Sequence, residues 1–174
     1  MASLAQFLAG QTLTADQLNA LIDDINELTG WVTTTSDFPK TNTTLAAVTG
    51  LVVPVGANSN YVIDGVFYVD GPTAGDIKFN STQPAGATGT HSIQAADTTA
   101  STPFNALNLG IQSIGGSSIV VGCIGAGTTL CVVYRGELVT VGAAGNFQIT
   151  AAQNAASGTS NVKAGSRLRA VKRP

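Results

Sequence analysis

The chain has little charge: only 10% of its 174 residues are Asp, Glu, Lys or Arg, against about 25% in an ordinary soluble domain. Its surface must therefore be covered largely by Ser, Thr, Asn, Gln and Gly. A nucleic-acid-binding domain needs a basic footprint to neutralise phosphates, whereas the net charge here is −2. We therefore expect no nucleic-acid partner.

Chemistry-bearing residues are also scarce. His91 is the only histidine, which excludes any site that needs two imidazoles, and the sequence has no Gly-x-Ser-x-Gly elbow, Walker loop or dinucleotide fingerprint. The spacing of Asp64, Asp70 and Asp76 does not exclude a pair of glycosidase carboxylates. Asp70-Gly-Pro, however, is interpreted first as a turn. We expect no enzyme, and no catalytic, cofactor-binding or metal-binding residue.

Long apolar runs are missing as well. No stretch approaches the 18 or so apolar residues of a membrane span, and Met1–Gly10 lacks the positive charge and apolar length of a signal peptide. We therefore expect no export signal and no membrane partner.

The two cysteines, Cys123 and Cys131, are eight residues apart. A hairpin turning about Gly127 would place them opposite each other, but two cysteines alone cannot form a closed zinc site. Without an export signal we expect free, buried thiols, and a cross-strand disulfide remains the alternative.

One strong helix is predicted over Leu13–Gly30. Thr14 can cap it and Gln17 completes a capping box. Its apolar residues follow the 3-4-3 spacing of an a/d seam: Leu18, Leu21, Ile25 and Leu28. The helix either packs on its own β-domain or forms a parallel bundle, most plausibly of three chains. Two heptads are too short to be stable alone, so the β-domains would have to hold the chains together.

The charges are divided between the two ends. Residues 1–30 carry four carboxylates and no Lys or Arg, whereas residues 163–174 carry five of the eight basic residues. The basic end is either a solvated tail or a docking contact to an acidic partner or neighbouring subunit. Before the helix, Leu4, Phe7 and Leu8 have i, i+3, i+4 spacing and no obvious place in a β-core. We predict that residues 1–30 form an oligomerisation helix and an anchor to a partner.

The rest of the chain is typical of a mainly β protein. Residues 31–44 are Thr-rich without a period and are interpreted as a linker, and residues 45–174 as one antiparallel β-sandwich, jelly-roll-like. The small polar stretch 81–90 is interpreted as a long exposed loop. The predicted strands are Leu45–Val48, Leu51–Val55, Tyr61–Val69, Asp76–Asn80, His91–Ala95, Ala106–Gln112, Ser118–Ile124, Leu130–Tyr134, Glu137–Val141, Phe147–Gln153 and Leu168–Lys172.

Three stretches together carry a resemblance: the helix Leu13–Gly30, the segment from Tyr61-Val-Ile-Asp-Gly-Val-Phe-Tyr-Val-Asp-Gly to Gly75-Asp-Ile-Lys-Phe, and the ending from Tyr134-Arg-Gly-Glu-Leu to Val162-Lys-Ala-Gly-Ser-Arg-Leu-Arg-Ala-Val. They resemble small virion structural proteins of tailed bacteriophages, notably those of actinobacterial hosts. The resemblance covers most of the chain and implies a trimeric β-sandwich on the particle.

The expected function is therefore structural: a homotrimeric capsid decoration protein on the outside of a phage head, whose partners are its own copies and the major capsid protein or tail proteins. The alternatives are a minor tail or tail-fibre component, and a module that binds a host-surface glycan or protein. Fold-level analogy carries this expectation.

Overall fold

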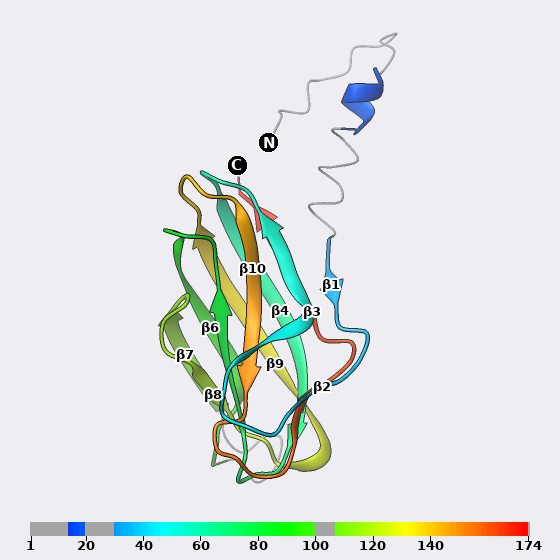
Figure 1. The fold of residues 1–174 in the computed structure, drawn as a ribbon, viewed down its shortest axis with the longest axis vertical. Coiled ribbons are helices and arrows are strands. Elements are labelled where there is room, and N and C mark those ends of the chain that lie inside the picture. The colour runs from blue at the N-terminus through cyan, green and yellow to red at the C-terminus, as the bar shows by residue number, and fades with distance from the viewer. Residues whose placement is uncertain (1–13, 20–29, 100–106, 174) are drawn as a thin grey trace.

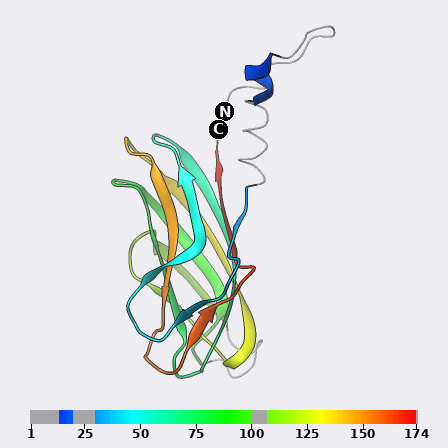
Figure 2. The same ribbon diagram turned by 45° about the vertical axis from the view of Figure 1, so that its right-hand side comes forward.

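The computed structural model describes residues 14–19, 30–99 and 107–173. It shows two antiparallel sheets packed face to face (Figures 1 and 2), with residues 15–19 helical. The predicted fold class, a β-sandwich with a short N-terminal helix, is confirmed. The strands are β1 (Val32–Thr33), β2 (Phe38–Lys40), β3 (Ala46–Val55), β4 (Asn60–Gly71), β5 (Ile77–Thr82), β6 (Thr88–Ala96), β7 (Leu107–Ser113), β8 (Ile119–Val121), β9 (Gly125–Val139), β10 (Gly145–Ala152), β11 (Ser160–Val162) and β12 (Arg167–Lys172).

The strand pairing is that of a jelly roll. Strand β6 pairs with β7, β5 with β8, β4 with β9 and β3 with β10, and all four pairs are antiparallel. Such nested pairs describe one long two-stranded ribbon, which is then rolled so that β6 also pairs with β9 and β10 with β5. The result is a small sheet ordered β3-β10-β5-β8 and a large sheet containing β4-β9-β6-β7.

The period-two pattern of the strands explains the sandwich. Along β4 the residues at odd positions from Tyr61 to Val69 are buried and those at even positions from Val62 to Tyr68 are partly exposed. The inner faces of both sheets meet in one core. At its centre the Phe67 ring lies 5.3 Å from Phe79 and 5.8 Å from Tyr134, and the Tyr134 ring lies 6.3 Å from Phe147.

Residues 31–44 do not form a free linker, and this interpretation is corrected. They contain β1, which pairs with β12, and β2, which pairs with β11. Both β11 and β12 pair with β4, so these four strands extend the large sheet beyond its jelly-roll edge. The reason is local: Val32 and Phe38 pack against the core, which holds an otherwise irregular segment on the sheet.

Two predicted strand breaks are absent. The break at Thr49-Gly50 lies inside β3, where Gly50 adopts φ +86° close to the backbone of Thr33 and Thr34. The break at Arg135-Gly136 lies inside β9, which runs unbroken for 15 residues. Gly136 faces His91 there: an added Cβ would lie 3.2 Å from the His91 Cβ. This glycine makes room for a neighbour, and it does not mark a turn.

The stretch 81–90 is not a long exposed loop. Strand β5 continues to Thr82 and β6 begins at Thr88, while Pro84 and Ala87 between them are buried. Small and polar residues are favoured in turns because of the backbone conformations they adopt, so this composition does not indicate how long or how exposed the turn is.

The predicted hairpin about Gly127 is also wrong. Strand β9 already begins at Gly125, and Cys131 pairs across to Tyr68 on β4. Cys123 lies before β9 and is buried, whereas Cys131 lies on the outer face and is exposed. Both thiols are free, as expected, but burial is confirmed for Cys123 alone.

Candidate functional site

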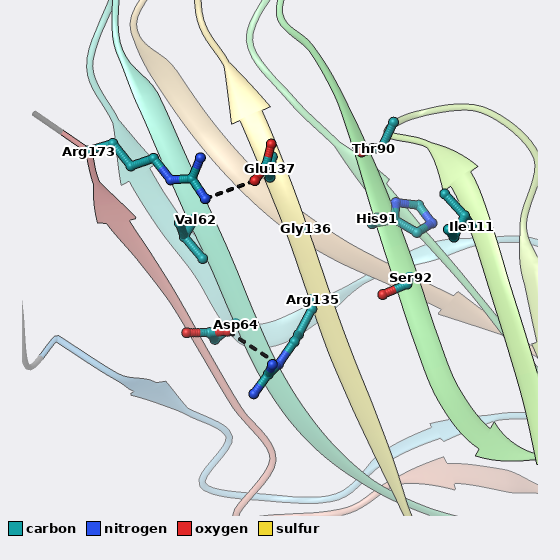
Figure 3. Close-up of a pocket in the computed structure, with 10 residues that line it drawn as sticks. All are labelled: Val62, Asp64, Thr90, His91, Ser92, Ile111, Arg135, Gly136, Glu137 and Arg173. Atoms are coloured by element: carbon teal, nitrogen blue, oxygen red, sulfur yellow. Dashed lines mark hydrogen bonds and ion pairs between the residues drawn. The ribbon is translucent and has the colours of Figure 1, made fainter.

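The outer face of the large sheet carries a row of side chains, polar except for Ile111, and Figure 3 draws the part of it from Asp64 to Ile111. Register places Arg169 on β12 opposite Asp64 on β4, and Asp64 opposite Arg135 on β9. The row continues to Ser92 on β6 and to Ile111 on β7. If neighbouring strands were paired two residues out of this register, other side chains would lie side by side, so the register determines which residues form the row.

Every arginine of the chain lies on this face. Arg135 and Arg169 belong to the row. Arg167 lies two residues before Arg169 on β12, and Arg173 lies four residues after Arg169, just beyond the end of that strand. By contrast, the strands of the small sheet carry a single charged residue, Lys78. The two outer surfaces of the sandwich therefore differ in chemistry: one is guanidinium-rich and the other is nearly uncharged.

The arginines differ in how fully they are engaged. Arg169 donates to Asp64 at 2.9 Å, and Arg173 donates to Glu137 at 2.8 Å. Arg135 approaches Asp64 only to 4.0 Å, and 76% of its side chain is exposed. Within the described part of the chain Arg167 makes no ion pair. Most of the guanidinium donors of Arg135 and Arg167 thus have no ion-pair partner among the described residues.

Trp31, the only tryptophan, lies beside the arginines. The guanidinium carbon of Arg169 is 4.7 Å from the centre of its ring and that of Arg167 is 5.0 Å away. These distances are in the range of cation–π contacts, which favour arginine over an indole face. The ring therefore holds two flexible side chains in place at the edge of the row.

Two adjoining grooves follow the row. The larger, of about 380 Å³, is lined by residues of β4, β9, β6 and β7 and by Arg173, just after β12. Figure 3 shows Arg173, Glu137, Asp64 and Arg135 along it, with Ile111 at its far side. The smaller, of about 200 Å³, lies against Trp31. Both are lined by Asp64 and Arg135, so the two grooves meet at the centre of the sheet.

Beneath this face, on the inner side of β6, lies His91. The side chain is 2% exposed, its ring is 5.1 Å from that of Tyr134, and neither ring nitrogen has a hydrogen-bond partner among the described residues. Burial lowers the pKa of His91 below its usual value and raises that of the Tyr134 hydroxyl. Both side chains are therefore neutral at pH 7, and the imidazole forms part of the core.

The three aspartates weighed as a glycosidase pair are held separately. Asp64 lines the grooves, but Asp70 accepts from the Asn161 amide at 2.7 Å at the far end of β4. Asp76, with φ +46°, accepts from the backbone N–H of Cys123 at 2.9 Å. Burial raises the pKa of Asp76, and the Cys123 hydrogen bond partly opposes this. The structure does not bring the three carboxyls into one groove.

The other predicted site residues fall mostly outside the described residues. Among the seam residues only Leu18 is described, and it is 45% exposed on the helical segment; Leu21, Ile25 and Leu28, and the anchor residues Leu4, Phe7 and Leu8, lie outside. The capping box is confirmed, since Thr14 N–H donates to Gln17 Oε1 at 3.0 Å and Gln17 N–H to Thr14 Oγ1 at 3.3 Å.

In the part of the chain that the structure describes, no cluster of three or more His, Cys, Asp or Glu residues could hold a metal ion. No helix among those same residues is long and apolar enough to cross a membrane.

Comparison with known proteins gives little. No protein-family model matches the chain, and no curated protein matches it. Among solved structures it is similar to chains of infectious bursal disease virus: 7% identity over 83% of this chain for the Gx strain (TM-score 0.20), and 9% over 83% for the Gt strain (0.17) and for the VP2 subviral particle (0.16). The chain spans 41%, 42% and 41% of those chains. TM-scores this low carry no argument, so the fold rests on the strand pairing.

Proposed function

We propose that this chain is a non-enzymatic structural protein of a virus particle, and specifically a homotrimer that decorates the outside of a tailed-phage head. The observation that carries the proposal is the nested pairing of β3 to β10, since jelly rolls of this kind recur in viral capsid domains. The low charge adds support, because charged residues are depleted where subunits meet.

The trimer is supported by the helical segment. Its capping box is formed, so the helix has a fixed start, and the seam residue Leu18 is left 45% exposed. An exposed leucine at an a position gains by packing against copies of itself. Three β-domains held on one particle would raise the local concentration that two short heptads need.

The attachment is proposed to lie in residues 1–30. Leu4, Phe7 and Leu8 could contribute several kcal/mol per chain when buried, before ordering costs, and three copies would add avidity. The β-domain would then project outward. A minor tail component would use the same trimer and the same anchor in residues 1–30, and the position on the particle distinguishes the two roles.

The trimer is tested by light scattering of the intact chain. We expect three times the chain mass of 17.5 kDa. Leu21→Asp or Ile25→Asp should give monomers, because a carboxylate in a buried seam is costly. Asn19→Asp, an exposed position outside the seam, is the matched control and should remain trimeric. A wild-type monomer at micromolar concentration would contradict the proposal.

The anchor is tested by deleting residues 1–30 and incubating the product with particles that lack the protein. The truncated chain should keep its β-sheet circular dichroism and fail to bind. If it still binds as the full chain does, the anchor lies elsewhere, and the basic strand β12 is the next segment to test.

A further inference from the structure

We propose that the groove on the outer face of the large sheet binds an acidic polysaccharide, a chain of sugars bearing carboxylate groups. The binding row, defined as Trp31, Arg169, Asp64, Arg135, Ser92 and Ile111 with the flanking Arg167, Glu137 and Arg173, is the contact surface. This binding activity goes beyond the structural role proposed above and does not depend on it.

The charge of the row selects an anionic ligand. Four arginines face two carboxylates, Asp64 and Glu137, so the surface is positive on a chain whose net charge is −2. Arginine matches a carboxylate with two parallel hydrogen bonds. Among the described residues, Arg135 and Arg167 are the two arginines whose donors are least used, so each can take one carboxylate of the ligand.

The spacing of these two arginines suits a polymer with a charge at intervals. Arg167 lies beside Val66, and Val66 beside Val133, two residues from Arg135 on β9. Two strand spacings combined with a two-residue offset put their Cα atoms roughly 12 Å apart. A ligand that meets both must carry carboxylates that are separated along an extended chain.

The groups between the arginines favour sugars over other polyanions. Asp64 and Glu137 can accept hydrogen bonds from hydroxyl groups but would repel the closely spaced phosphates of a nucleic acid. Ser92 and Thr90 add hydroxyls that both donate and accept. A hydroxyl-rich ligand satisfies this mixture of donors and acceptors through its substituents, whereas the carboxylate side chains of an acidic peptide can only accept.

The shape agrees with an extended ligand. The grooves of about 380 and 200 Å³ meet at Asp64 and Arg135, so together they form one open groove across the sheet from Ile111 to Trp31. At one end Ile111 is 76% exposed and offers an apolar contact for the C–H face of a sugar ring. The volume of the larger groove lies within the roughly 300–1,000 Å³ that is typical of ligand sites.

The test uses the intact chain and a short oligogalacturonate, with the fully methyl-esterified oligomer as the uncharged control ligand. Binding is measured by calorimetry, and by the emission of Trp31, which is the only tryptophan. Arg135→Gln and Arg167→Gln should each weaken binding on the order of ten-fold. Lys78→Gln, which removes a charge from the opposite sheet, is the matched control and should bind as the wild type does.

The expected result is binding of the acid form that weakens as salt is raised, with no binding of the ester. Unchanged thermal midpoints of the variants show that they are folded. Equal binding of acid and ester, or no loss in the two arginine variants, would overturn the proposal. Polyglutamate of equal charge that binds as tightly as the oligogalacturonate would also overturn it, since the face would then be a docking site for acidic protein.

Discussion

Arg169 donates two hydrogen bonds to one oxygen of Asp64, from Nε at 3.1 Å and from Nη2 at 2.9 Å. The two residues face each other across β12 and β4, and the guanidinium is also 4.7 Å from the centre of the Trp31 ring. The Arg169 side chain thus joins β12, the last strand in the chain, to β4 and to the segment before β1. The pair is part of the sheet's construction as well as of its charged face.

Replacing Trp31 should loosen this corner. Trp31→Ala removes the ring under both Arg167 and Arg169, and a cation–π contact contributes about 0.5–2 kcal/mol depending on exposure. We expect a loss of about 1–3 kcal/mol in the free energy of unfolding for the two contacts and the lost packing, measured by urea denaturation. Trp31→Phe keeps a ring and should lose less than half as much. Equal losses in the two variants would show that the ring contacts do not matter.

Acid should destabilise the fold through His91. Burial lowers its folded pKa below 6.5, so the unfolded chain binds more protons once the pH falls below about 7. The contribution of His91 to the free energy of unfolding is therefore fully present above that range, and it is lost as the pH falls through 6.5 towards the folded pKa. Urea denaturation at a series of pH values from about 7.5 to about 5 should show a falling free energy of unfolding.

The control is His91→Phe, which keeps a ring against Tyr134 and removes the titrating group. The pKa of Asp76 is raised, so protonation of Asp76 increases the free energy of unfolding as the pH falls, opposite to the effect of His91. Asp76 titrates at lower pH than His91 and is unchanged in this variant. The slope between about pH 7 and 5 should largely disappear in the variant. The same slope in both proteins would assign the effect to other groups.

Gly89 should not tolerate a side chain. A Cβ there would lie 1.9 Å from the backbone oxygen of Glu137 on the paired strand, so Gly89→Ala must separate β6 from β9. We expect a loss above the roughly 1–3 kcal/mol of ordinary overpacking, or failure to fold. Gly142→Ala has open space within 4 Å and is the matched control, expected to change stability by less than about 0.5 kcal/mol.

The two thiols should differ in reactivity. Cys131 is exposed, whereas burial, with Asp76 and Asp70 nearby, raises the pKa of Cys123 to about 12. Because the thiolate is the reactive form, titration with a thiol reagent should find one reactive group in the native protein and two after denaturation. Two rapidly reacting thiols in the native protein would show that the segment around Cys123 opens.

The sequence predicts the parts of the fold that depend on local chemistry. The alternation in Tyr61–Val69 predicts β4, and the Thr14–Gln17 spacing predicts the capping box that is observed. The predicted break between Tyr134 and Glu137 is wrong because the role of Gly136, space for His91 on the neighbouring strand, is set by tertiary packing. Likewise β1 and β2 are too short to have a period, and they exist because β12 and β11 offer them partners.

The binding row could not have been predicted from the sequence. Arg167 and Arg169 have the alternate spacing of one strand face, but Asp64 and Arg135 are 71 positions apart and meet only through register. A long-range register depends on the whole hydrophobic pattern, and one sequence does not fix it. Trp31 lay in a segment interpreted as a linker, so nothing indicated that it would face the arginines.

Electron cryomicroscopy of the intact virion whose genome encodes this protein tests the proposed structural role most directly. The account predicts threefold-symmetric density on the outside of the head, three jelly-roll domains projecting from it, and their N-terminal segments at the capsid surface. Density for this chain on the tail would contradict the decoration role, and its absence from the purified virion would contradict any structural role in the particle.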